Sequence, residues 1–161
     1  MNNVEWTPEW LAETIKLLRT HGSDTQFIEV KKAHGGYTGS LDATLSSFSN
    51  SSTGGIIICG LDENNDFAPV GVYDPADLEK TLGNKLRRGL KPPNTMESGT
   101  ILYEDAKIFV ATIPPLPPYE RPAYIGGKAY VRSGDGDHEM SRHETDLMVA
   151  QRTRTGFDEE P

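Results

Sequence analysis

The stretch that decides the fold is Gly54–Glu63, which reads GGIIICGLDE. Its centre, Ile56–Cys59, is a continuous apolar run of strand length. Because such a run has no polar face, it is typical of a strand that is buried on both sides. A second strand is predicted earlier in the chain, over Phe27–Lys32, and the two together form the framework of the domain.

Helices are predicted on either side of these strands in the first part of the chain. Thr7 is a suitable cap for a helix that ends near Gly22, and a proline follows it in the first turn. Ser40 is expected to cap a second helix, because apolar residues recur on one face from Leu41 onward. After the acidic loop that follows the buried strand, residues 67–73 are predicted to form another strand.

A third helix and several antiparallel strands are predicted in the second part of the chain. The helix starts at Asp74 and repeats leucine every fourth residue as far as Leu90. Strands follow at about 99–104 and 107–113, and a tight turn joins them. A proline-rich connector then leads to a hairpin at 124–131.

The chain is long enough for one core, and its ends are expected to be appendages of that core. Residues 1–22 are predicted to be an N-terminal helix that packs on the domain, and 23–152 the domain itself. A capping box of Ser141 and Glu144 begins its last helix. Residues 153–161 are predicted to be a polar tail that starts a linker in a longer parent protein.

The composition favours a soluble, cytoplasmic protein with no membrane partner. Cys59 is the single cysteine, which excludes an internal disulfide and a cysteine-rich zinc site. Since it lies in the buried strand, it is expected to be an inert core residue. No apolar stretch approaches the length of a membrane span, and the N-terminus lacks the features of a signal peptide.

The net charge of −8 argues against a globally basic nucleic-acid binder, because Lys and Arg supply most of the affinity for phosphates. The distribution of the charges is more informative than their sum. Acids gather at 62–63, 135–137 and 158–160, whereas cations crowd one stretch of the predicted third helix. These cations are Lys80, Lys85, Arg87, Arg88 and Lys91.

Two segments of this chain resemble the core motifs of the Schlafen-type Alba-like (AlbA-2) domain, a family described as DNA-binding. The first is the strand Phe27–Lys32, and the second runs from a helix ending at Asn50 through Gly-Gly and the apolar strand to Gly60–Glu63. The segment Tyr130–Gly134 is similar to the closing Tyr-x-Arg-x-Gly strand of the family. The resemblance covers the chain from about Asp24 onward and implies an α+β fold, a mixed sheet with packing helices.

The resemblance also implies a nucleic-acid (DNA) binding module of a transcriptional regulator. Since Alba-like domains often pair, it implies a homodimer as well. For Arg132, the residues alone leave a nucleic-acid contact and a surface ion pair both open. The predicted contacts to nucleic acid are Lys31, Lys32, Lys85, Arg87, Arg88, Lys91, Lys128 and Arg132.

A metal-dependent endoribonuclease is the alternative function. The Schlafen ribonucleases use two acids five residues apart and the Asp of Gly-x-Asp, which correspond here to Asp24, Glu29 and Asp62. Three converging carboxylates would favour Mg²⁺ or Mn²⁺ and phosphodiester cleavage, and no other cofactor is expected. The residues also allow a purely structural reading, in which Glu29 pairs with Lys31 and Asp62 closes its strand.

A further alternative is an oligomerisation or protein-interaction domain, which the acidic surface would permit.

Overall fold

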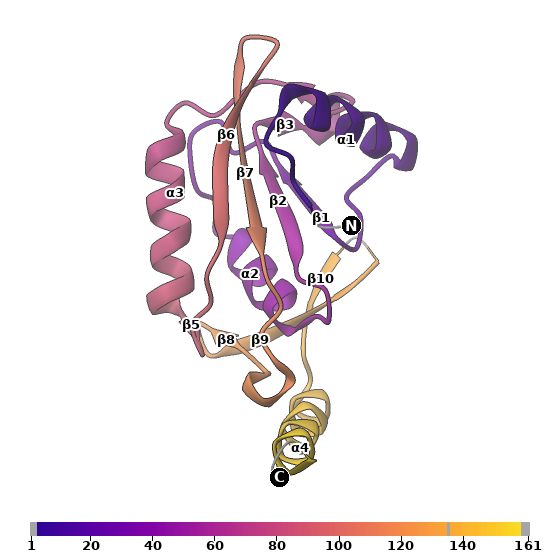
Figure 1. Ribbon diagram of the computed structural model, residues 1–161, viewed down its shortest axis with the longest axis vertical. Coiled ribbons are helices and arrows are strands. Elements are labelled where there is room, and N and C mark those ends of the chain that lie inside the picture. The colour runs from indigo at the N-terminus through magenta and orange to yellow at the C-terminus, as the bar shows by residue number, and fades with distance from the viewer. Residues whose placement is uncertain (1–2, 135, 159–161) are drawn as a thin grey trace.

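The structure of the chain is a computed structural model, which describes residues 3–134 and 136–158. The described chain has two four-stranded sheets, a two-stranded sheet and the helices that cover them (Figure 1). In the first sheet β1 runs parallel to β2 and the other neighbours are antiparallel, so the sheet is mixed. Its strands, in spatial order, are β1 (Ile28–Lys31), β2 (Gly55–Cys59), β7 (Ala106–Ile113) and β6 (Glu97–Tyr103). The α+β prediction is confirmed.

Strand β2 is buried along its whole length and separates two apolar cores, as its sequence predicts. Ile56 and Ile58 face the first core, where they pack with helix α1 (Pro8–His21). Ile57 and Cys59 face the second core, with helices α2 (Leu41–Asn50) and α3 (Pro75–Asn84). Burial raises the pKa of the Cys59 thiol to about 12, so this residue is unreactive core, as expected.

The Gly54–Gly55 pair permits a close approach of α2 to the first sheet. A Cβ atom on Gly55 would lie 2.4 Å from the Phe48 ring, so a side chain there would displace the main aromatic residue of α2. Gly54 has a φ of +72°, which is a conformation that glycine adopts without steric cost. The two glycines are therefore required by packing and backbone geometry.

Helix α1 has the boundaries that the sequence predicts. The Thr7 hydroxyl accepts a hydrogen bond from the Trp10 amide at 3.1 Å, and Gly22 closes the helix in a left-handed conformation. Helix α2 starts at the predicted place, but Ser40 forms no side-chain capping bond, because its backbone is already helical. The last helix, α4 (Arg142–Asp158), begins with the predicted capping box, and it extends through 153–158, where no periodicity was apparent.

The second sheet lies across the far side of α2, as Figure 1 shows at its lower end. The β8–β9 hairpin turns at Gly126–Gly127, as predicted, with a positive φ at both glycines. Strand β10 was not predicted, because its sequence is short, polar and glycine-containing. In spatial order the strands are β10 (Gly136–Glu139), β9 (Lys128–Ser133), β8 (Tyr124–Ile125) and β5 (Leu90–Lys91).

The predicted third helix is wrong in its last part. Asp74 caps α3 as expected, but the helix widens at Lys85–Gly89 into a π-helical turn, and Leu90 then enters β5. Glycines within the segment weaken the α-helix, and the prolines that follow Lys91 prevent its continuation. Pairing of β5 with β8 sets the point at which the chain leaves the helix.

The strand predicted over 67–73 is also shorter than expected. Only β4 (Ala68–Pro69) is extended and paired, and its partner is β3 (Leu61–Asp62). Gly71, with a φ of +80°, ends the run, because that backbone conformation does not fit a strand. Short 3₁₀ turns η1 (Glu63–Asn65) and η3 (Pro118–Glu120) complete the connections. The strands β6 and β7 match the predicted pair closely.

Candidate functional site

A buried charge cluster joins the two sheets. The Arg132 side chain on β9 is 2% exposed, and its Nη1 lies 2.7 Å from Glu29 Oε1 and 3.0 Å from Asp137 Oδ1. Nε and Nη2 donate to the backbone carbonyls of Thr25 and Ile28. The guanidinium group also lies over the Phe48 ring, 5.1 Å from its centroid. Arg132 is thus a structural cation whose donors are used inside the protein, and it is not presented to a ligand.

Hydroxyl groups of α2 complete this cluster. Asp137 accepts hydrogen bonds from Ser47 Oγ at 2.5 Å and Thr44 Oγ1 at 2.7 Å. Burial alone would lower the pKa of Arg132, but hydrogen bonds and attraction from Glu29 and Asp137 raise it above its usual value. Arg132 therefore stays charged in the interior, and its hydrogen bonds satisfy the requirement for a buried ion.

Asp24 lies beside this cluster as a neutral acid. It is 8% exposed, and its Oδ1 accepts a hydrogen bond from the Val30 amide at 3.0 Å. Burial, and then hydrogen bonding and repulsion from Glu29, raise the pKa of Asp24 to about 9. Asp24 is therefore protonated at neutral pH.

Asp62 has the role of a turn residue at the end of its strand. Its Oδ1 accepts a hydrogen bond from the Asn64 amide at 3.1 Å and caps η1, and Lys32 Nζ lies 3.8 Å from its other oxygen. Among the residues that the structure describes, no group of three or more His, Cys, Asp or Glu is arranged to hold a metal ion. The predicted set Asp24, Glu29 and Asp62 does not form one metal-binding group, because Asp62 is engaged elsewhere.

Outside residues 80–91, all three lysines predicted to contact nucleic acid have acidic partners of their own. Lys31 Nζ lies 3.4 Å from Glu29 Oε2, as the structural reading of the sequence expects. Lys32 pairs with Asp62, and Lys128 Nζ lies 3.7 Å from Glu139 on the neighbouring strand. Their charges are therefore compensated locally, which reduces their attraction for phosphate groups.

The cations of Lys80–Lys91, here called the basic segment, are arranged differently. Lys85 contacts Asp42 at 3.3 Å and lies over the Tyr37 ring. Within the described part of the chain, the other cations of the segment have no acid within ion-pair distance, and all of them are exposed. These are Lys80, Arg87, Arg88 and Lys91.

The π-helical turn separates two hollows on the surface of the basic segment. One, of about 360 Å³, is lined by Thr81, Asn84, Lys85, Arg88 and Gly89. Its side chains offer hydroxyl, amide and cationic donors and no carboxylate, which suits an anion such as a phosphate group. Arg87 lines the other hollow, between α3 and the start of β6.

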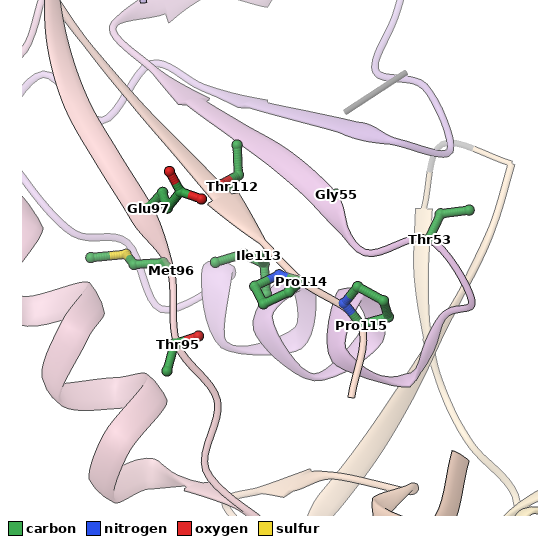
Figure 2. A pocket seen from close by; sticks show the side chains of 9 residues that line it. All are labelled: Thr53, Gly55, Thr95, Met96, Glu97, Thr112, Ile113, Pro114 and Pro115. Atoms are coloured by element: carbon green, nitrogen blue, oxygen red, sulfur yellow. The ribbon is translucent and has the colours of Figure 1, made fainter. Parts of the chain in front are cut away.

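A further hollow, of about 290 Å³, lies where β2, β7 and the proline-rich connector meet (Figure 2). Glu97 is the one charged residue among those that line it, and threonines, prolines and Met96 provide most of the remaining surface. An acid without a neighbouring base, nucleophile or second acid does not form a catalytic group. We therefore place the candidate site on the basic segment.

Asn50, the motif residue at the end of α2, has a structural role that the sequence did not indicate. Its Oδ1 accepts a hydrogen bond from the Ala123 amide at 2.7 Å, and its Nδ2 donates to the Tyr130 carbonyl at 3.0 Å. Ser46 forms similar bonds to the same two residues. Asn50 and Ser46 thereby attach α2 to the second sheet. The run of small polar residues in α2 was the one signal for this contact.

Asp137 was missed altogether, because it follows a glycine-rich turn and looks like a loop acid.

Comparison with known proteins agrees with this fold. A family model described as Schlafen, AlbA_2 matches residues 24–141. The solution NMR structure of the N-terminal domain of a RecG-related protein from Nitrosomonas europaea is 21% identical, with a TM-score of 0.60. The match covers 81% of this chain and 94% of that one.

The crystal structure of the DIP2311 protein from Corynebacterium diphtheriae is 14% identical, with a TM-score of 0.58. That match covers 88% of this chain but 32% of the other, so this chain corresponds to about a third of that protein. No curated protein matches the chain. Within the residues that the structure describes, no helix is long and apolar enough to cross a membrane.

Proposed function

Because the chain belongs to the Schlafen, AlbA_2 family, we propose that it is a nucleic-acid-binding domain whose contact surface is the basic segment. One observation carries the proposal: Lys80, Arg87, Arg88 and Lys91 are exposed, close in sequence and unpaired with acids in the described chain. Such cations can neutralise phosphate groups without first breaking an internal ion pair. The donor-lined hollow beside Arg88 adds a place where one phosphate can be held.

We extend the proposal to DNA as the target and to a role in a transcriptional regulator that acts as a homodimer. Closed two-fold pairs are the commonest oligomers, and two copies would double a small basic surface. Helix α4 supports this, because it projects from the rest of the chain (Figure 1) and its Leu147 side chain is 53% exposed. Light scattering that finds a monomer at every accessible concentration would contradict the homodimer.

Binding to nucleic acid should be weak, independent of sequence and steeply dependent on salt. A few cations must act against a net charge of −8, so binding should be weak. Added salt weakens the contacts between cations and phosphates, which are the main attraction, and it also screens the general repulsion. Phosphate contacts also carry no information about the base sequence. We expect affinities in the range of ordinary non-specific binding, roughly 10⁻⁴–10⁻⁶ M.

The proposal is tested by reversing charges. The double variant Arg87→Glu/Arg88→Glu should lose measurable binding of a fluorescent oligonucleotide at low salt, as followed by anisotropy. The matched control is Lys32→Glu/Lys128→Glu, which changes the net charge by the same amount at lysines that have acidic partners. Equal losses in the two variants would mean that only total charge matters, and unchanged binding in the first would remove the basic segment from the site.

A further inference from the structure

A groove between α3 and the start of β6 adjoins the basic segment. It has a volume of about 260 Å³ and is called here the α3–β6 groove. Arg87 contributes an exposed cation to it, and Leu86 and Met96 contribute apolar surface. The groove is smaller than the roughly 300–1,000 Å³ that a drug-sized ligand requires, but it has room for one planar ring. Its lining residues are Gly83, Leu86, Arg87, Asn94, Thr95, Met96 and Ser98.

Gly83 allows two side chains of this groove to approach α3 closely. A Cβ atom at this position would lie 3.1 Å from Arg87 Nη2 and 3.8 Å from Met96 Cε. Arg87 Nε also donates to the Gly83 carbonyl at 3.4 Å. The planar guanidinium group is thus held against the helix, with the thioether of Met96 near the same glycine. A planar cation and a polarisable sulfur are both good contact surfaces for an aromatic ring.

We propose that the α3–β6 groove holds one base of a single-stranded nucleic acid, while the neighbouring phosphate groups contact the basic segment. The proposal rests on the proposed function and names its substrate class. Unpaired bases stack on arginine planes and on apolar side chains, whereas the bases of a duplex are already stacked on one another. The groove lies directly beside unpaired cations, so one strand can reach both surfaces.

The charges of α3 favour a single strand over a duplex. Exposed acids lie at the cap and in the first turns of the helix, Asp74, Asp77 and Glu79, and the unpaired arginines follow only after its last turn. A duplex that lay along α3 would bring its phosphates against these carboxylates. A single strand that crosses the π-helical turn meets Arg87 on one side and Arg88 on the other.

The α3–β6 groove also leads on to a second hollow beyond the proposed position of the base. It shares Thr95 and Met96 with the hollow of Figure 2, in which the Met96 side chain points away from Pro114 and Pro115. A strand that leaves the groove therefore meets further surface that is uncharged except at Glu97.

The test compares three labelled ligands of equal length: oligothymidine, an abasic strand with the same phosphates, and a duplex. The full chain should bind oligothymidine more tightly than either of the others at low salt. Met96→Ala should weaken oligothymidine binding by about tenfold, because a stacking contact is lost, and should leave the abasic strand unaffected. Lys80→Gln is the control, since it should weaken all three ligands alike.

A second variant separates an effect on binding from an effect on folding. Gly83→Ala should leave the melting temperature unchanged or raise it, because alanine favours the helix and the displaced atoms are the ends of flexible side chains. The same change should weaken oligothymidine binding several-fold, since it moves the Arg87 guanidinium group. If duplex binds as tightly as oligothymidine and neither variant matters, the groove proposal fails and the proposed function stands. If none of the ligands binds at low salt, the proposed function fails, and the groove proposal with it.

Discussion

Arg132 on β9 and Glu29 on β1 form an ion pair of 2.7 Å that links the second sheet to the first. The two strands are far apart in the sequence and belong to different sheets. Their side chains nevertheless meet in the interior beside α2, and Asp137 on β10 completes the pair from the other side. The charge cluster is thus a direct contact between the two four-stranded sheets, made by residues that are far apart in the sequence.

Replacing Arg132 with methionine should lower the free energy of unfolding by about 3–5 kcal/mol, because Glu29 and Asp137 would lose their buried partner. Urea unfolding followed by fluorescence measures this. Arg142→Met changes an exposed arginine in the same way and should cost little. Similar losses in the two variants would show that the charge cluster stabilises the fold no more than an exposed arginine does.

Asp24 should make stability fall as the pH rises. Its pKa is 3.8 in the absence of the fold and about 9 within it, so between these values the folded chain holds a proton that the unfolded chain has lost. Its contribution is therefore complete below about pH 4 and decreases up to about pH 9. Asp24→Asn imitates the neutral acid, and its melting temperature should exceed that of the parent by an amount that grows from pH 5 to pH 8.

The comparison for Asp24 is Asp105→Asn, which alters an exposed turn acid and should follow the pH profile of the parent. A constant difference between Asp24→Asn and the parent at all pH values would mean that Asp24 is charged in the folded protein.

Asn50 should contribute more to the free energy of unfolding than an ordinary polar residue does. Its replacement by alanine leaves the Ala123 amide and the Tyr130 carbonyl without their partner, at roughly 1–3 kcal/mol for each buried group. Chemical denaturation should show a loss in this range or up to twice it. Asn65→Ala, at an exposed position in η1, should be close to neutral, and a small loss for Asn50→Ala would mean that water replaces the missing bonds.

Mn²⁺ should not change the melting temperature of the protein. Asp62 caps η1 and pairs with Lys32, and among the described residues no group of three or more His, Cys, Asp or Glu is arranged for a metal ion, so ligand linkage should not stabilise the fold. Asp62→Asn can make the same cap and should melt like the parent with and without the ion. A rise with Mn²⁺ in the parent that Asp62→Asn abolishes, or cleavage of a structured RNA, would instead support the endoribonuclease.

Local sequence patterns were sufficient for most of the elements. Thr7, Asp74 and Ser141 mark helix starts through bonds to residues within the next turn, and the apolar run Ile56–Cys59 identifies the central strand by itself. Interactions within a few residues can be recognised from spacing alone, and these elements depend on them.

The charge cluster could not be predicted in the same way. Arg132 resembles a surface cation because its strand also carries Lys128, and Asp137 follows a glycine-rich turn. Their partners come from β1 and α2, across sequence separations that no short motif spans. The end of α3 was missed for a similar reason, since the pairing of Leu90 with Ile125 decides where the helix stops.

The π-helical turn Lys85–Gly89 has a genetic consequence. Such a turn contains one residue more than the α-helical turn that would replace it. Loss of a single codon there would restore a regular helix and rotate the following side chains by about 100° about its axis. Loss of Leu86, for example, would turn the two arginines that follow it toward a different side and keep both of their charges. In this family member, a one-residue deletion in the turn could therefore alter the recognition surface while leaving the net charge as it is.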